Sequence, residues 1–224
     1  MPISIAIDGP AGAGKSTIAK AVAKTLHFLY LDTGAMYRTC GLQALRHGLK
    51  PDDEDALVEL IRNCTIEVAF VDGEQAMLLN GENVNSQIRT PAVSRWASDI
   101  SRIAEVREMM VSLQRDIATK QNVVMDGRDI GTYVLPQADL KIYLTACLEE
   151  RAKRRYLELQ TKENGMDLEA VKEDIRFRDE QDSTRAHAPL KRAPDAILLD
   201  TSGLSIEEVI ERVLAEVRTL TDEE

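Results

Sequence analysis

Residues Gly9-Pro10-Ala11-Gly12-Ala13-Gly14-Lys15-Ser16 match the phosphate-binding pattern Gly-x-x-x-x-Gly-Lys-Ser/Thr. The preceding run, residues 3–7, is short and apolar, which is typical of a buried parallel strand. The following run, residues 17–26, is rich in alanine and carries apolar residues at helical spacing. In a strand–loop–helix unit, backbone N–H groups and the helix N-terminus surround a phosphate. The sequence therefore predicts a domain that binds a nucleoside triphosphate.

Two side chains of this loop have the chemistry that ATP requires. Lys15 is expected to reach the β- and γ-phosphates, and the hydroxyl of Ser16 is expected to bind Mg²⁺. We expect the rest of the loop to contact ATP as well, through Gly9, Pro10, Ala11, Gly12, Ala13, Gly14 and Thr17.

Length, composition and charge limit the possible functions. A chain of 224 residues with 44% hydrophobic residues suits one α/β domain, and no stretch is long enough to cross a bilayer. The net charge of −10 argues against a general nucleic-acid binder, because phosphate backbones require a basic surface. An anionic substrate must therefore meet a local group of arginines.

Cysteine usage and the start of the chain predict a cytoplasmic protein. The three cysteines, Cys40, Cys64 and Cys147, have neither metal-ligand spacing nor an even disulfide framework. The chain opens directly into a strand, without the basic region and apolar core of a signal peptide. A monomer is expected, since no exposed apolar stripe is evident.

Five short apolar runs are expected to form one parallel sheet, with helices between most of them. They are residues 3–7, 28–31, 123–126, 140–145 and 196–200. Residues 64–90 interrupt this order with two short alternating runs and the turn signals Asp72-Gly73 and Asn80-Gly81. They predict a small antiparallel insert, which we expect to be a separate lobe rather than an extension of the main sheet.

Two polar segments follow predicted strands, where an open parallel sheet gathers its ligands. The first contains Asp32, Thr33 and Arg38, and Arg38 could present its guanidinium to a phosphate; alternatively, the first two residues only cap a helix and Arg38 is solvated. The second contains Asp126 at a strand end, where such enzymes place a metal-organising carboxylate, followed by Arg128-Asp129. Its alternative is a local salt-bridged turn.

Two further helical segments carry charged residues: the first has Arg151, Lys153, Arg154 and Arg155, and the second has Arg176, Arg178, Asp182 and Arg185. The spacing of Arg178, Asp182 and Arg185 places them on one helical face. An ordinary solvated face would show the same spacing. Because residues 160–167 form a polar break between the segments, the pair also fits a lid that closes over phosphates.

Four motifs together make the chain resemble the bacterial cytidylate kinases. They are the phosphate loop, Asp32-Thr33-Gly34-Ala35-Met36-Tyr37-Arg38, Asp126-Gly127-Arg128-Asp129-Ile130-Gly131-Thr132, and the Arg178-Asp179-x-x-Asp182-x-x-Arg185 pattern. The similarity covers essentially the whole chain, including the insert. The phosphate loop is shared by many families, whereas the last two motifs are far more specific.

The resemblance implies a P-loop kinase of class α/β with a five-stranded parallel sheet flanked by helices, a small antiparallel insert and an α-helical lid. It implies a single domain, 1–224, with a core of residues 1–33, 121–150 and 187–224. The monophosphate-binding lobe spans about 34–120, with the insert at about 64–90, and the lid spans about 151–186. The implied reaction is phosphorylation of CMP and dCMP by ATP with Mg²⁺, without nucleic-acid or membrane partners.

The family pattern also implies residue roles. Arg38, Arg128 and Arg185 correspond to arginines that hold the acceptor phosphate, and Lys15, Arg128 and Arg185 are the implied catalytic residues. Further substrate contacts are implied for Thr33, for Arg178 and Asp182 at the sugar hydroxyls, and for Ser98, Arg107 and Asp129 at the cytosine. Arg151 and Arg155 are implied ATP contacts. Some family members carry glycine at the position of Ser16 and serine at that of Thr33.

Rival functions leave parts of the sequence unexplained. A related P-loop kinase could act on UMP, AMP or a metabolite such as shikimate, although a phosphate-free acceptor needs fewer arginines. A GTP-binding switch should carry an Asn-Lys-x-Asp motif, which is absent. An acidic scaffold protein would not require the organised arginines.

Overall fold

Five parallel strands form the central sheet, in the order β2-β6-β1-β7-β8. The computed structural model describes residues 2–71, 74–160 and 167–222, except the side chains of 221 and 222. The strands are β1 (Ser4–Asp8), β2 (Leu29–Asp32), β6 (Val123–Gly127), β7 (Leu140–Thr145) and β8 (Ile197–Asp200). All five strand predictions are confirmed to within one residue at each end.

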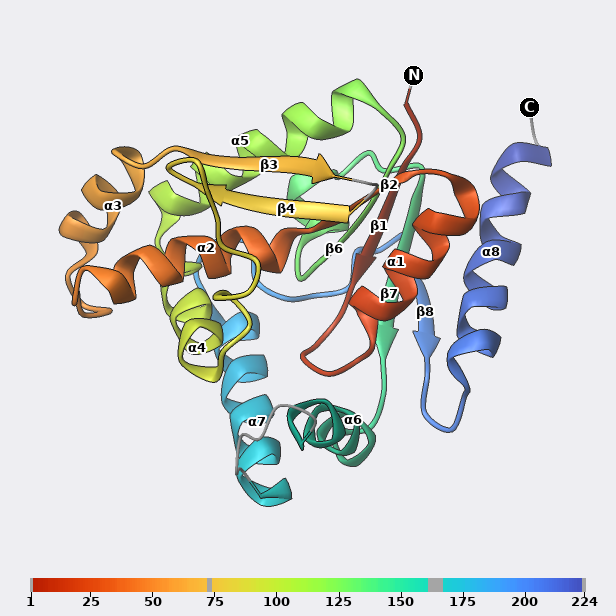
Figure 1. Cartoon of the computed structure of the whole chain (residues 1–224). Helices are drawn as coiled ribbons and strands as arrows, with labels where there is room; N and C mark the ends of the chain where they lie inside the picture. Colours follow the sequence, from red (N-terminus) through yellow and green to blue (C-terminus); the bar gives the residue numbers. More distant parts are fainter. Residues whose placement is uncertain (1, 72–73, 161–166, 223–224) are drawn as a thin grey trace.

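Helices cover both faces of this sheet (Figure 1). In β1, Ile5 and Ile7 pack with α1 (Lys15–Leu26) and α8 (Ile206–Asp222). The alternate residue Ala6 belongs to the second core, which is built with α2 (Thr33–Arg46), α3 (Glu54–Arg62), α4 (Pro91–Ile100) and α5 (Ala104–Lys120). Strand alternation therefore divides the apolar residues between two layers of helices.

The predicted insert forms a separate antiparallel sheet that lies along α2 (Figure 1). Its strands are β3 (Ile66–Val71), β4 (Glu74–Leu79) and β5 (Glu82–Asn83), and Val68 pairs with Met77. Met77 and Leu79 face the core that the insert shares with α2. The expected turn at Asp72-Gly73 lies outside the described residues.

Two helices, α6 (Leu148–Gln160) and α7 (Leu168–Thr184), lie beyond the carboxyl ends of β7 and β8 (Figure 1). They pack on each other through a small apolar cluster that includes Leu159 and Val171. Most of the polar break expected at 160–167 lies outside the described residues.

Arg185 is the residue that follows the helix carrying Arg178 and Asp182, and its backbone N–H still donates to the carbonyl of Gln181 at 3.2 Å. The helix ends at Thr184, and Arg185 has an extended backbone with ψ of 142°. The chain turns here because the backbone N–H of Leu190 donates to the carbonyl of Asp182, at 2.7 Å. Arg185 still reaches Asp182, with Nη1 3.9 Å from Oδ1.

Gly9 is required by packing at the end of β1. Its φ is +147°, and a Cβ added there would lie 2.0 Å from the backbone oxygen of Leu144. No side-chain movement could relieve this overlap, because the obstacle is the backbone of β7. The first glycine of the phosphate loop therefore allows the loop to leave the sheet beside β7.

We expect Gly9→Ala to lower the free energy of unfolding by about 3 kcal/mol or more, because strain and overlap add. Gly203→Ala is the control: Gly203 also has a positive φ, +72°, but nothing lies within 4 Å of its added Cβ. That variant should lose only about 1 kcal/mol in urea unfolding. Equal losses in the two variants would contradict the packing explanation.

Candidate active site

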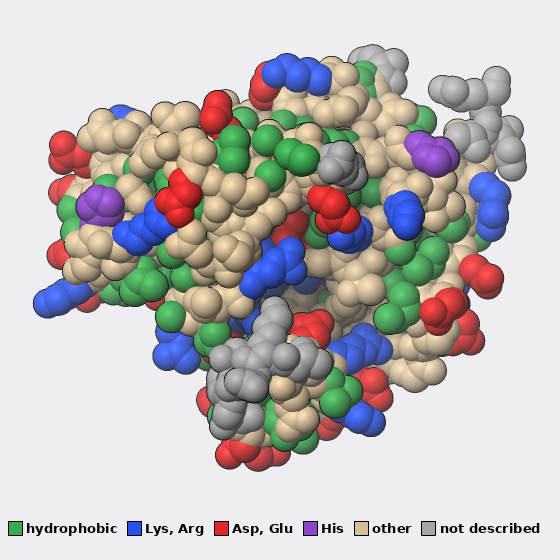
Figure 2. All heavy atoms as spheres, in the orientation of Figure 1, with side chains coloured by type: hydrophobic (Ala, Val, Ile, Leu, Met, Phe, Trp, Pro, Cys, Tyr) green, Lys and Arg blue, Asp and Glu red, His purple; other side chains and the backbone are tan. Residues whose placement is uncertain are grey.

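A cleft of about 470 Å³ opens at the carboxyl edge of the central sheet. In the space-filling view, Lys and Arg side chains gather around a hollow in the middle of the face, above α6 and α7 (Figure 2). Basic residues from several elements line the cleft: Lys15, Arg38, Arg89, Arg107, Arg128, Arg155, Arg178 and Arg185. This concentration of positive charge suits an anionic ligand, although the whole chain carries a net charge of −10.

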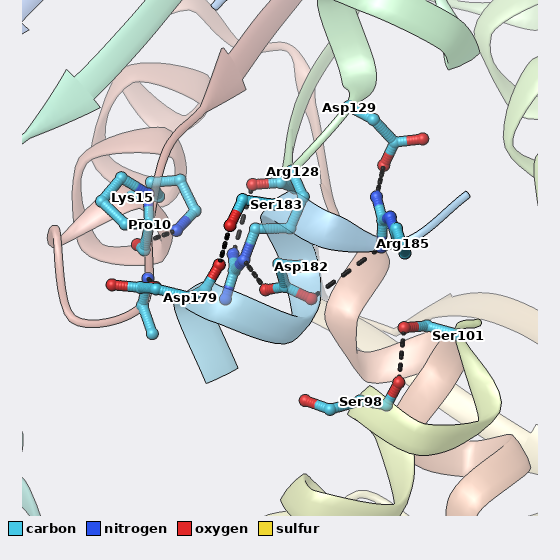
Figure 3. A network of polar contacts seen from close by, with 12 residues as sticks. Pro10, Lys15, Ser98, Ser101, Arg128, Asp129, Asp179, Asp182, Ser183 and Arg185 are labelled. Atoms are coloured by element: carbon cyan, nitrogen blue, oxygen red, sulfur yellow. Dashed lines mark hydrogen bonds and ion pairs between the residues drawn. The ribbon is translucent and has the colours of Figure 1, made fainter. Parts of the chain in front are cut away.

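The phosphate loop places Lys15 at the floor of the cleft. Gly14 has a φ of +86° and precedes α1, so the helix N-terminus opens toward the loop. Lys15 is 5% exposed, and its Nζ donates to the carbonyl of Pro10 at 2.7 Å (Figure 3). Burial, aided by Arg128, lowers the pKa of Lys15 to about 7. An anion bound in the loop would favour its charged form.

Ser16 and Asp126 lie side by side at the end of β6. The Ser16 hydroxyl donates to one carboxylate oxygen of Asp126 at 2.8 Å, and the Tyr30 hydroxyl donates to the other at 2.8 Å. Burial, aided by Asp32, raises the pKa of Asp126 to about 6. A hydroxyl and a carboxylate are oxygen donors of the kind that Mg²⁺ prefers, so these residues fit the ion.

Groups of alternating charge, most of them buried, cross the side of the cleft between β6 and α7 (Figure 3). Arg128 donates to Asp182 at 2.7 Å, Asp182 lies 3.9 Å from Arg185, and Arg185 donates to Asp129 at 3.0 Å. Arg107 donates to the second oxygen of Asp129. We call Arg128, Asp182, Arg185, Asp129 and Arg107 the charge chain. Although burial opposes ionisation of Asp182, Arg128 and Arg185 hold its pKa below the ordinary value.

Asp32 organises the start of α2. Its side chain accepts from the backbone N–H of Ala35 at 2.9 Å, which is the capping role considered as an alternative. Arg38 is not solvated, however: it is 19% exposed and donates to Asp32 at 2.7 Å. The Nε of Arg38 and that of Arg178 are buried without a hydrogen-bond partner among the described residues.

Three other predicted residues also line the cleft. Thr33 donates from its hydroxyl to the carbonyl of Asp126 at 2.7 Å. Ser98 is buried on α4, with its carbonyl accepting from the hydroxyl of Ser101 (Figure 3). Arg155 lies on α6 and pairs with Glu158 at 3.0 Å.

Four predicted ATP-binding residues are not in the cleft lining: Gly9, Pro10, Ala13 and Arg151. Ala13 is buried in the core with α1 and α8. Arg151 donates to the carbonyl of Ala11 at 2.9 Å and pairs with Asp179 at 2.5 Å. Arg151 therefore supports the phosphate loop from outside, and its contact with ATP stays a prediction.

The structure adds cleft residues that sequence reasoning missed. Arg89 lies 3.8 Å from Asp32, in a segment without a recognisable pattern. Tyr37 was quoted in a motif without a role, and its ring lies 5.5 Å from the guanidinium carbon of Arg107. Asp8, immediately before the loop, lies outside the cleft lining and accepts at 2.8 Å from the backbone N–H groups of residues 130 and 131, which follow Asp129.

Solved structures with little sequence similarity share the fold. A gluconokinase from Sinorhizobium meliloti is 12% identical and superposes with a TM-score of 0.52 over 99% of this chain and 95% of its own. An uncharacterized protein from Eubacterium ventriosum is 11% identical, with a TM-score of 0.55 over 98% and 99% of the two chains. At these identities, the likeness concerns the fold alone.

Sequence relatives are much closer. The cytidylate kinase of Caldicellulosiruptor bescii is 52% identical over 95% of this chain and 94% of its own length. Those of Caldanaerobacter subterraneus and Bacillus cereus are 52% and 51% identical, over 99% and 95% of this chain and 97% and 95% of theirs. The family model of cytidylate kinase matches residues 5–219. With the phosphate loop and the arginine-lined cleft joined in one site, the chain belongs to the cytidylate kinase family.

Proposed function

We propose that this protein transfers the γ-phosphoryl group of ATP to CMP and dCMP, giving ADP with CDP or dCDP. One observation carries the proposal: the phosphate loop and the acceptor-side arginines line the same cleft. A donor triphosphate and an acceptor monophosphate can therefore meet within it. The family membership supports cytidine nucleotides as acceptors.

The donor half neutralises the triphosphate. Lys15 and the N-terminus of α1 supply positive charge, and Arg155 adds to it from the lid helix α6. Ser16 and Asp126 are placed to hold a Mg²⁺ bound with ATP, directly or through water. That ion would supply further neutralisation of the phosphate oxygens.

The acceptor half aligns the nucleophile. We assign Arg38, Arg128 and Arg185 to the monophosphate, and Arg178 and Asp182 to the sugar hydroxyls. The attacking oxygen of a monophosphate is already anionic, so the reaction requires no general base. Catalysis consists of positioning and charge neutralisation around a loose transition state, and closure of α6 and α7 would exclude water.

We assign base recognition to Ser98, Arg107 and Asp129. Cytosine offers an exocyclic amine donor together with ring acceptors, whereas uracil reverses the polarity at two of these positions. Asp129 retains lone pairs beside its two arginine partners and can accept from the amine. Arg107 is buried beside it and can donate to the ring acceptors.

We propose lobe boundaries, a cellular location and an oligomeric state that agree with this function. We assign about 34–120 to the monophosphate lobe, about 151–186 to the lid and the remaining residues to the core. Among the described residues, no helix is both long and apolar enough to cross a membrane. The three cysteines are free thiols, which supports a reducing cytoplasm, and we propose a monomer acting on nucleotides rather than polymers.

Lys15→Ala should abolish turnover while the fold is retained, because the γ-phosphate loses its buried cation. The test is a coupled assay with ATP and a panel of nucleoside monophosphates, alongside a thermal melt. Lys24→Ala, at an exposed position on the same helix, is the control and should keep full activity. Near-normal turnover of Lys15→Ala would refute the phosphate-loop assignment, and preference for UMP or AMP would refute the proposed acceptor.

Asp129→Asn should lower the CMP/UMP ratio of kcat/KM by about tenfold, since a lost or reversed hydrogen bond at a buried site costs about 1–3 kcal/mol. The KM for ATP should stay within a factor of about two, a ratio worth less than 1 kcal/mol. Asp116→Asn, on the exposed side of α5, is the matched control. An unchanged CMP/UMP ratio would mean that Asp129 does not contact the base.

Without nucleotide, the free energy of unfolding of Asp126→Asn relative to wild type should be higher at pH 8 than at pH 4.5. The pKa of Asp126 is raised from 3.8 to about 6, so wild-type stability from this group falls as pH rises through that window. The non-titrating variant should gain on the order of 2 kcal/mol over wild type between these pH values in urea unfolding. Activity at limiting Mg²⁺ should fall. A stability difference independent of pH would contradict the raised pKa.

A further inference from the structure

The insert touches the central sheet at a defined point, the last residue of β2. This strand is at the edge of the sheet, so one side of its backbone has no neighbouring strand. Gln75 of β4 fills this position with its side-chain amide. Its Oε1 accepts from the backbone N–H of Asp32 at 2.7 Å, and its Nε2 donates to the Asp32 carbonyl at 3.2 Å. One amide thus replaces the two hydrogen bonds of a missing strand.

Asp32, whose backbone is hydrogen-bonded by Gln75, also forms ion pairs with two arginines of the cleft. The carboxylate of Asp32 pairs with Arg38 at 2.7 Å and lies 3.8 Å from Arg89. It also caps α2, which carries Arg38. A small rotation of the Asp32 peptide would therefore move both the anchor of Arg38 and the start of its helix.

Gln75 is itself held within the insert. Its carbonyl accepts from the side-chain amide of Asn85 at 2.8 Å, and the same Asn85 side chain accepts from the backbone N–H of Met77 at 2.9 Å. The Nε2 of Gln75 also contacts the sulfur of Met77 at 3.1 Å. These contacts connect the insert continuously to Arg38.

We propose that Gln75 is a positioning residue for the acceptor phosphate, acting through Asp32 on Arg38. The insert then has a role in the reaction, since it fixes the arginine that the monophosphate meets. The inference depends on the proposed role of Arg38. Gln75 does not line the cleft, so its effect is expected on acceptor binding through Arg38 and not by direct contact.

The chain offers a matched control at the neighbouring residue. Glu74 also joins the insert to the core, through an exposed ion pair with Lys20 of α1 at 2.6 Å. Glu74→Gln removes this ion pair and leaves the hydrogen bonds between Gln75 and Asp32 in place. If the insert only needs attachment, the Gln75 and Glu74 variants should behave alike.

The test compares Gln75→Met, which keeps the side-chain length but loses both hydrogen bonds, with Glu74→Gln and wild type. For Gln75→Met we expect the KM for CMP to rise about three- to tenfold, as two hydrogen bonds of modest net strength predict. The KM for ATP and the melting temperature should change little. An unchanged KM for CMP, or equal effects in the two variants, would overturn the proposal. Gln75→Asn, one methylene too short, serves as the second variant if the first does not fold.

A double-mutant cycle with Arg38→Met tests the route. If Gln75 acts through Arg38, adding Gln75→Met to Arg38→Met should change the KM for CMP less than twofold, about 0.4 kcal/mol. Effects that multiply would overturn the proposed route. If Arg38→Met alone leaves the KM for CMP unchanged, the assignment of Arg38 to the acceptor phosphate fails, and the inference fails with it.

Discussion

Charge alternation within the cleft is the constraint on which the site depends. Arg107 is 1% exposed and Arg185 is 8% exposed, and isolated guanidinium groups at such positions would lose most of their hydration. Asp129 and Asp182 lie between the arginines and make their burial possible. Removing one partner would leave an uncompensated buried charge, which is costlier than never forming the pair. The charge chain therefore joins α5, the end of β6 and α7 into one unit.

Around the phosphate loop, in contrast, burial disfavours the charged forms of three side chains. Burial lowers the pKa of Lys15 and raises those of Asp8 and Asp126. An anion beside Lys15 and a cation beside Asp126 would favour the ionised forms of these two groups, so their binding should stabilise the folded state.

The insert illustrates how a second sheet becomes part of the site. Its apolar side joins the core around α2, which is sufficient for attachment. The amide of Gln75 does something more specific, because it satisfies the open edge of β2 at the residue that anchors Arg38. Proteins commonly cover an exposed sheet edge. Here the covering residue, Gln75, is also connected through Asp32 to Arg38, which lines the cleft.

Local patterns were sufficient for the elements and for the donor loop. Apolar runs predicted every strand of the central sheet, and the glycine pattern predicted the loop, because strand propensity, helix capping and phosphate cradling depend on residues close together in the sequence. The motif segments also identified most of the residues that line the cleft. Helix periodicity did not show, however, that α7 ends at Thr184, where the backbone N–H of Leu190 donates to the carbonyl of Asp182.

Family membership and the predicted reaction could thus be recognised from the sequence alone. Only the tertiary structure decided which arginines are engaged by carboxylates, which one supports the loop from outside, and which unpatterned residue, Arg89, joins the cleft. It also decided that Gln75 meets Asp32. The reason is physical: most of these contacts join residues from tens to more than a hundred positions apart, and side-chain identity limits what can pair without specifying which partner the packing brings within reach.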